Sequence, residues 1–151
     1  MRSSIRFAVP VAFALGILVG PLASAQSPAQ QLRVRVNGVQ SRGGNIGCAL
    51  YRGERGFPTE RQHALRQVTV RARGRTAVCV FDDLPPGTYA VSVMHDQDAD
   101  GQLDTNLFGA PSEGWAVSND APASTFGPPS YGAASFRYAG GQGAIQVRMR
   151  Y

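Results

Sequence analysis

Lysine is absent from this sequence, and all 15 of its basic residues are arginine. Cysteine and tryptophan are scarce, with two Cys and one Trp among 151 residues. No Cys-x-x-Cys pair occurs, which argues against a zinc site or a redox-active dithiol. Helical periodicity is also lacking, because no stretch after the first 25 residues keeps apolar side chains at helical spacing over three turns. A chain of this length suits one domain and excludes a multidomain enzyme.

A long unbroken apolar run is missing as well. Arg2 and Arg6 precede an apolar stretch at residues 7–22, which two prolines and two glycines interrupt and which ends in Ala-Ser-Ala. A short positive start, a short apolar run and a small-residue site predict a secretory signal peptide at residues 1–25. The mature chain would be residues 26–151, a periplasmic or secreted single domain and not an integral membrane protein.

Positive and negative charges occupy different halves of the chain. Ten arginines and only two acids lie between Arg33 and Arg75, whereas residues 82–120 hold eight acids and no arginine. An arginine-rich half is compatible with an anion-binding module, but no nucleic-acid motif accompanies it, and we expect no nucleic-acid partner. Solvent-facing arginines on strands are the simpler interpretation. Eight acids without a counter-charge repel one another, and a bound metal ion would compensate them.

Apolar residues recur at every second position in short runs that glycine and proline turns separate. The runs lie at residues 32–36, 46–50, 68–70, 78–81, 89–93, 136–138 and 145–149. This pattern predicts an all-β fold, an antiparallel β-sandwich of about seven strands. Residues 58–66 have room for one short helix. Residues 95–132 show little alternation, and a connection of that length in a compact domain usually carries function.

The two cysteines, Cys48 and Cys79, both fall in strand-like runs. Cys48 is in phase with Ile46 and Leu50, and Cys79 is in phase with Phe81, so both side chains are expected on inner faces. Two cysteines in an exported chain most often form one disulfide, which here would join the two sheets. A pair of buried free thiols is the alternative that the sequence leaves open.

The long connection begins with carboxylates at alternate positions followed by glycine, in the order Asp96-x-Asp98-x-Asp100-Gly101. This spacing is that of the first half of a calcium loop, in which alternate side chains converge on one point and the glycine permits a sharp turn. The predicted calcium ligands are the carboxylates of Asp96, Asp98, Asp100, Asp104 and Glu113 and the carbonyl of Gln102.

The loop departs from an EF-hand in two respects. Leu107 stands where an EF-hand has a bidentate glutamate, and a strand, not a helix, is expected before the loop. A large all-oxygen ligand set favours calcium over magnesium, and zinc would require His or Cys. The alternative interpretation is a solvated turn in which the Asp side chains accept hydrogen bonds from backbone amides.

His95 precedes the acidic loop and supports two interpretations. A small hydrolase would use His95 with Asp96 or Glu113 for acid–base chemistry. The simpler interpretation is a structural histidine, hydrogen-bonded at the end of a strand, that braces the loop. Neither a Ser-His-acid motif nor a phosphate-binding glycine loop occurs in the sequence, so the structural role and a non-enzymatic protein are favoured.

Several motifs of the chain occur together in one order. They are Asp83-Leu84-Pro85-Pro86-Gly87-Thr88-Tyr89-Ala90, His95-Asp96, Asp100-Gly101-Gln102-Leu103-Asp104-Thr105-Asn106, Phe108-Gly109-Ala110-Pro111, Glu113-Gly114 and Ser118-Asn119. In these motifs the chain resembles DUF2141, a family of uncharacterised exported bacterial proteins. The resemblance implies a single signal-bearing domain with a transthyretin-like or carboxypeptidase-regulatory-like β-sandwich and no assigned activity. It also implies that His95, the acidic loop, Glu113 and Asn119 belong to one site.

These features together predict an exported, non-enzymatic β-sandwich with a calcium-binding acidic loop. Its role would be that of a binding or envelope-associated module, with a protein or another envelope component as its partner. In this hypothesis Gly101 makes the turn of the loop, and His95 and Asn119 support it.

Overall fold

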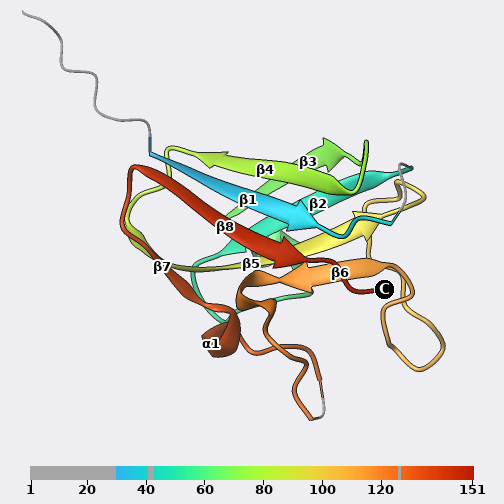
Figure 1. The fold of residues 1–151 in the computed structure, drawn as a ribbon. Helices are drawn as coiled ribbons and strands as arrows, with labels where there is room; N and C mark the ends of the chain where they lie inside the picture. Colours follow the sequence, from blue (N-terminus) through green and yellow to red (C-terminus); the bar gives the residue numbers. More distant parts are fainter. Residues whose placement is uncertain (1–29, 41–42, 126) are drawn as a thin grey trace, which may run out of the picture.

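The structure is a computed structural model that describes residues 30–40, 43–125 and 127–151. The predicted signal peptide, residues 1–25, lies outside the described residues. Within them the chain forms eight strands in two sheets and almost no helix, which confirms the predicted all-β sandwich. Figure 1 shows the sheet of β4, β1 and β8 lying over the sheet that contains β3, β2, β5 and β6.

The first sheet has the strand order β4-β1-β8. Its strands are β1 (Gln31–Asn37), β4 (Thr76–Asp82) and β8 (Gln142–Arg148). In β1 the buried Leu32, Val34 and Val36 alternate with the exposed Arg33 and Arg35, because successive side chains of a strand point to opposite faces. Arg33 and Arg35 therefore face solvent on the outer side of this sheet.

The second sheet has the order β3-β2-β5-β6, and β7 pairs with the beginning of β5. Its strands are β2 (Asn45–Tyr51), β3 (Arg66–Arg71), β5 (Gly87–Asp96), β6 (Gly114–Val117) and β7 (Phe136–Tyr138). Strands β2 and β5 are buried on both faces, unlike β1. A second, smaller cluster covers part of the outer face, formed by Ala90, Val117, Ala121 and Ala134 with the partly buried Phe57, Trp115 and Tyr131.

The structure adds detail that periodicity alone did not supply. The pair β1·β8 is parallel, whereas the other strand pairs of the described residues are antiparallel. Strand β6 lies inside the segment 95–132, which had been expected to be irregular. A short 3-10 helix, η1 (Arg61–His63), occupies the predicted helical stretch, and α1 (Tyr131–Ala134) is one helical turn that the side chain of Ser130 caps.

The described residues contain no helix with the length and apolar character that a membrane span requires. Their one α-helix has four residues.

The core between the sheets is closed by a disulfide between Cys48 on β2 and Cys79 on β4. Both cysteines are fully buried among aliphatic and aromatic side chains, including Val34, Leu50 and Phe81. The bond joins one sheet to the other, as the phase of the two strands predicted. Of the two alternatives that the sequence left open, the disulfide is the one found.

Removing this disulfide is expected to destabilise the fold. The bond closes a loop of 31 residues in the sequence, and a loop of that length lowers the conformational entropy of the unfolded chain by an amount worth about 3–4 kcal/mol. The double variant Cys48→Ala/Cys79→Ala should lose about that much free energy of unfolding, measured by urea denaturation against the oxidised protein. An unchanged denaturation midpoint would contradict the structural role of the bond.

Candidate metal centre

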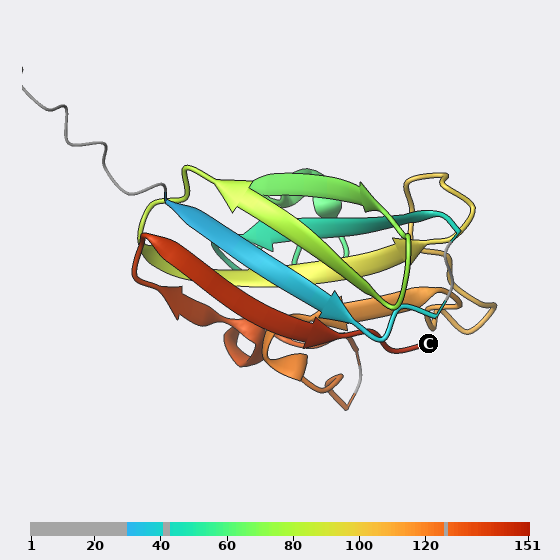
Figure 2. The same ribbon diagram turned by 45° about the horizontal axis from the view of Figure 1, so that its top comes forward.

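The acidic loop begins where β5 ends. Asp96 is the last residue of β5, pairs with Asn45 of β2 and is buried. Beyond it the chain turns sharply, and Ala99 and Gly101 have positive φ angles of 66° and 85°. Such angles favour glycine, which agrees with the turn predicted at Gly101. Figure 2 shows this loop at the end of the sandwich where β5 ends, near the C-terminus of the chain.

Carboxylates at the start of the loop accept hydrogen bonds from backbone amides of the turn. The two oxygens of Asp96 accept from the amides of Asp100 and Gly101 at 3.1 and 3.0 Å, and Asp98 accepts from Asp100 at 3.2 Å. These contacts fix the positions of the carboxylates by local geometry. They use only part of the acceptor capacity, because an ionised carboxylate has about four lone-pair positions.

Glu113, the residue immediately before β6, reaches the same place. The antiparallel register pairs His95 with Gly114, so the residue before Gly114 lies beside the beginning of the loop. The Glu113 carboxylate is buried and accepts hydrogen bonds from the amides of Gln97 at 2.7 Å and Asp104 at 3.2 Å. This side chain therefore fastens both ends of the segment 97–104.

Asp96, Asp98 and Glu113 form the acidic group of the site. One carboxylate oxygen from each lies within 4.8 Å of the others, and Asp96 and Glu113 are buried while Asp98 is exposed. No arginine of the described residues forms an ion pair with any of them. Three negative charges at this separation repel one another strongly in a partly buried position. The arrangement therefore has the ligand atoms and the uncompensated charge that suit a cation.

The other predicted ligands lie in the loop but outside this group. The exposed Asp100 accepts a hydrogen bond from the amide of Gln102 at 2.7 Å, and Asp104 is exposed. Partial desolvation, followed by repulsion from Glu113 and the loop aspartates, raises the pKa of Asp104 above its usual value. Asp104 thus experiences the negative field of the acidic group without joining it.

His95 is placed on the inner side of β5 and is fully buried. Its Nε2 lies 2.9 Å from the carbonyl of Gly43, and its Nδ1 lies 2.7 Å from the hydroxyl of Tyr151. Burial raises the pKa of Tyr151, and because a carbonyl oxygen can only accept, Nε2–H of His95 donates to Gly43. Both ring nitrogens of His95 are therefore engaged within the fold.

The partner of His95 could not be found from the sequence. Tyr151 is 56 residues away and outside the expected strands, and no local pattern marks it. Its hydroxyl also accepts a hydrogen bond from the amide of Gln40 at 3.0 Å. Tyr151 thus joins the end of β5 to the segment that follows β1.

Asn119, which was expected near the acidic loop, is directed elsewhere. Its side-chain amide donates to the carbonyls of Ala133 at 3.2 Å and Ser135 at 2.8 Å. The residue therefore ties the 3-10 turn η2 (Ser118–Asp120) to α1 and does not point toward the acidic group.

The sequence was compared with families and with known proteins. A family model described as "uncharacterized protein conserved in bacteria", DUF2141, matches residues 34–146. The chain belongs to the DUF2141 family. Neither the curated proteins nor the solved structures give a significant match. The region matched to DUF2141 includes both cysteines and the whole acidic loop, whereas Tyr151 lies beyond it.

Replacing Tyr151 with Phe should destabilise the protein. The change removes the 2.7 Å hydrogen bond between the Tyr151 hydroxyl and Nδ1 of the buried His95, and such a bond contributes about 0.5–1.5 kcal/mol. The matched control is Tyr131→Phe, which removes a 3.2 Å hydrogen bond to the exposed Thr88 carbonyl and should cost less. Equal losses in the free energy of unfolding for the two variants would contradict the bracing role of Tyr151 and His95.

Proposed function

We propose that this DUF2141 chain is an exported, non-enzymatic β-sandwich that binds calcium in its acidic loop and presents the ordered loop to a partner. The observation that carries the proposal is the acidic group of Asp96, Asp98 and Glu113, whose carboxylate oxygens lie within 4.8 Å of one another. A divalent cation between them would remove the repulsion and exploit the acceptor positions that the backbone amides leave.

Calcium is the ion best suited to this donor set. It takes six to eight oxygen ligands in flexible geometry, and small movements of Asp100, Asp104 and the Gln102 carbonyl would complete the three carboxylates. Zinc prefers nitrogen and sulfur ligands. The ring of His95 is engaged with Gly43 and Tyr151, and both cysteines are in the disulfide, so neither type of ligand is available.

The loop also provides a surface for a partner. Leu107 and Phe108 stand at its tip with essentially their whole side chains exposed, at 102% and 95%. The side chain of Asn106 accepts hydrogen bonds from the amides of Phe108 and Ala110 at 2.9 and 3.1 Å and so shapes this tip. Neighbouring exposed apolar side chains on a structured loop support the proposal of a protein or envelope partner.

Calcium should stabilise the mature protein, and Asp98→Asn should abolish the effect. Extracellular calcium modules bind with dissociation constants of about 10⁻⁴–10⁻³ M, and a hundredfold excess over such a constant adds about 2.7 kcal/mol of stability. Thermal melts of residues 26–151 in calcium, magnesium and chelator measure this. The matched control is Asp83→Asn, which makes the same charge change at the exposed turn before β5, where the positive φ of 50° suits Asn.

A calcium-selective rise in melting temperature that Asp83→Asn keeps and Asp98→Asn loses is the expected result. Equal shifts with calcium and magnesium, or the same shift in both variants, would count against a calcium site in this loop. If calcium does not change the melting temperature of the unmodified protein, the interpretation of the loop as a solvated acidic turn is favoured instead.

Export is supported by the Ala-Ser-Ala site of residues 23–25 and by the disulfide, because such bonds persist in oxidising compartments. Expression of the full chain in a Gram-negative host should give a periplasmic product that begins at Gln26. Intact mass spectrometry after cell fractionation measures the cleavage. Recovery of the uncleaved chain from the cytosol would contradict export.

A further inference from the structure

A cleft of about 670 Å³ lies on the outer face of the second sheet, on the side away from the core. Its floor is formed by Ser92 and Met94 of β5 and Trp115 of β6, and one wall is the segment that follows Gly101 in the acidic loop. The lining is mainly apolar. The volume is in the range of sites that hold small organic molecules.

One charged side chain, that of Arg61, reaches this cleft from η1. Its guanidinium lies beside Gly47 of β2, where Nη1 donates a hydrogen bond of 3.3 Å to the Gly47 carbonyl. A Cβ atom at residue 47 would lie 3.0 Å from Nη2 and 3.1 Å from Cε of Met94. Glycine in the interior of a strand often marks a close approach of this kind, and here it makes room for the guanidinium.

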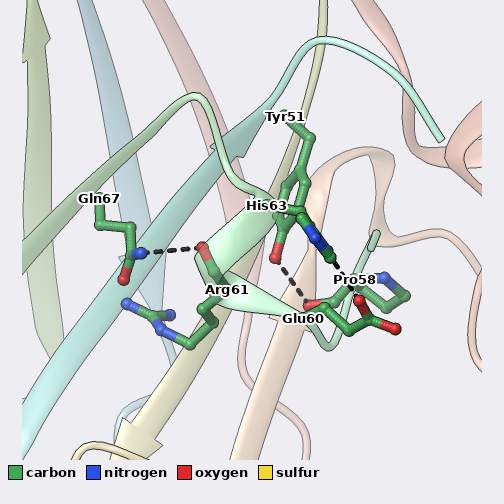
Figure 3. Close-up of polar contacts among 6 residues, drawn as sticks. All are labelled: Tyr51, Pro58, Glu60, Arg61, His63 and Gln67. Carbon is green, nitrogen blue, oxygen red and sulfur yellow. Dashed lines mark hydrogen bonds and ion pairs between the residues drawn. The ribbon is translucent and has the colours of Figure 1, made fainter. Parts of the chain in front are cut away.

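The backbone that carries Arg61 is held by several polar contacts, which Figure 3 shows. The side chain of Gln67 donates to the Arg61 carbonyl at 2.8 Å, and the Tyr51 hydroxyl donates to the carbonyl of Pro58 at 3.3 Å. Nδ1 of His63 lies 2.7 Å from a carboxylate oxygen of Glu60. Glu60 is therefore engaged with His63, although it is the neighbour of Arg61 in the sequence.

The positive charge of Arg61 has no carboxylate partner within the part of the chain that the structure describes. A guanidinium has five N–H donors, and the hydrogen bond to Gly47 uses one of them. Desolvation by burial lowers the pKa of Arg61, and the charges of Tyr51 and Asp96 oppose this shift. Partial burial of a guanidinium without a bound anion raises the free energy of the folded state. The Arg61 guanidinium lines the cleft, where a ligand could supply that anion.

We propose that this cleft binds a small apolar molecule with a carboxylate head, held by the Arg61 guanidinium while Met94 and Trp115 contact its apolar body. The planar fork of arginine matches the two oxygens of a carboxylate. Trp115 is itself fixed on the sheet, because the guanidinium of Arg150 lies 5.1 Å from the centre of its ring. The site uses none of the three carboxylates of the acidic group, although the segment that follows Gly101 lines the cleft.

The probes are decanoate and decanol, which share an apolar chain and differ in the head group. Trp115 is the one tryptophan of the sequence and lines the cleft, so its fluorescence reports binding directly. Titrations of the mature protein are made in chelator, below the concentration at which either probe aggregates. Because the Arg61 guanidinium would form charged hydrogen bonds with the carboxylate, we expect decanoate to bind about ten- to a hundredfold more tightly than decanol.

Arg61→Gln should reduce the affinity for decanoate to that for decanol. The matched control is Arg35→Gln, which removes the same charge from the exposed face of the other sheet and should keep the preference. Gly47→Ala retains Arg61 but displaces its guanidinium, and it should also remove the preference. Thermal melts of each variant report folding, so a misfolded Arg61→Gln protein leaves Gly47→Ala as the test.

Equal binding of decanoate and decanol to the unmodified protein would overturn the proposal, as would the absence of any saturable change in fluorescence. Retention of the decanoate preference by folded Arg61→Gln or Gly47→Ala would also overturn it. None of these results bears on calcium binding, because the titrations contain no free metal and the acidic group is unchanged.

Discussion

The pairing register of β5 is the constraint on which the rest of the structure depends. This strand pairs with β2, β6 and β7, and its alternation places His95 toward the core and Asp96 on the opposite face. The pairing of His95 with Gly114 then brings Glu113 beside the beginning of the acidic loop. A slip of one residue would exchange the two faces of β5 and separate these groups. The disulfide fixes β2, the strand that pairs with β5, to β4 of the other sheet.

Two regions of opposite charge meet around the outer face of the second sheet. Among residues 30–40, 43–125 and 127–151, no arginine forms an ion pair with the three carboxylates of the acidic group, and no carboxylate forms one with the Arg61 guanidinium. They interact only at longer range, through the field of Asp96 at Arg61. Each region therefore keeps a charge that an external partner would compensate, a cation for the loop and an anion for the cleft. The segment that follows Gly101 belongs to the acidic loop and also lines the cleft, so the two sites share a wall.

The sequence predicted the features that depend on local pattern. Period-two runs identified β1, β2 and β5, and the phase of two runs placed Cys48 and Cys79 on inner faces, where a disulfide could form. The spacing of Asp96 and Asp98 predicted the acidic loop. Contacts between distant segments have no local pattern in the sequence that would predict them. The alternation of β6 was too short to recognise in four residues, and nothing local indicates that Tyr151 bonds to His95 or that β8 runs parallel to β1. Gly47, a glycine inside an apolar run, was the one local feature that could have indicated a close approach at the cleft. The approaching side chain, Arg61, is placed by a loop whose path could not be predicted from the sequence.

The central claim is that the three carboxylates at the end of β5 hold a calcium ion. A crystal structure of residues 26–151 grown with calcium and phased by anomalous scattering tests it most directly. We expect one ion in contact with Asp96, Asp98 and Glu113 at oxygen distances of about 2.3–2.6 Å, with loop oxygens or waters completing the shell. Density for water alone at that position, with the carboxylates still accepting hydrogen bonds from the turn amides, would contradict the claim.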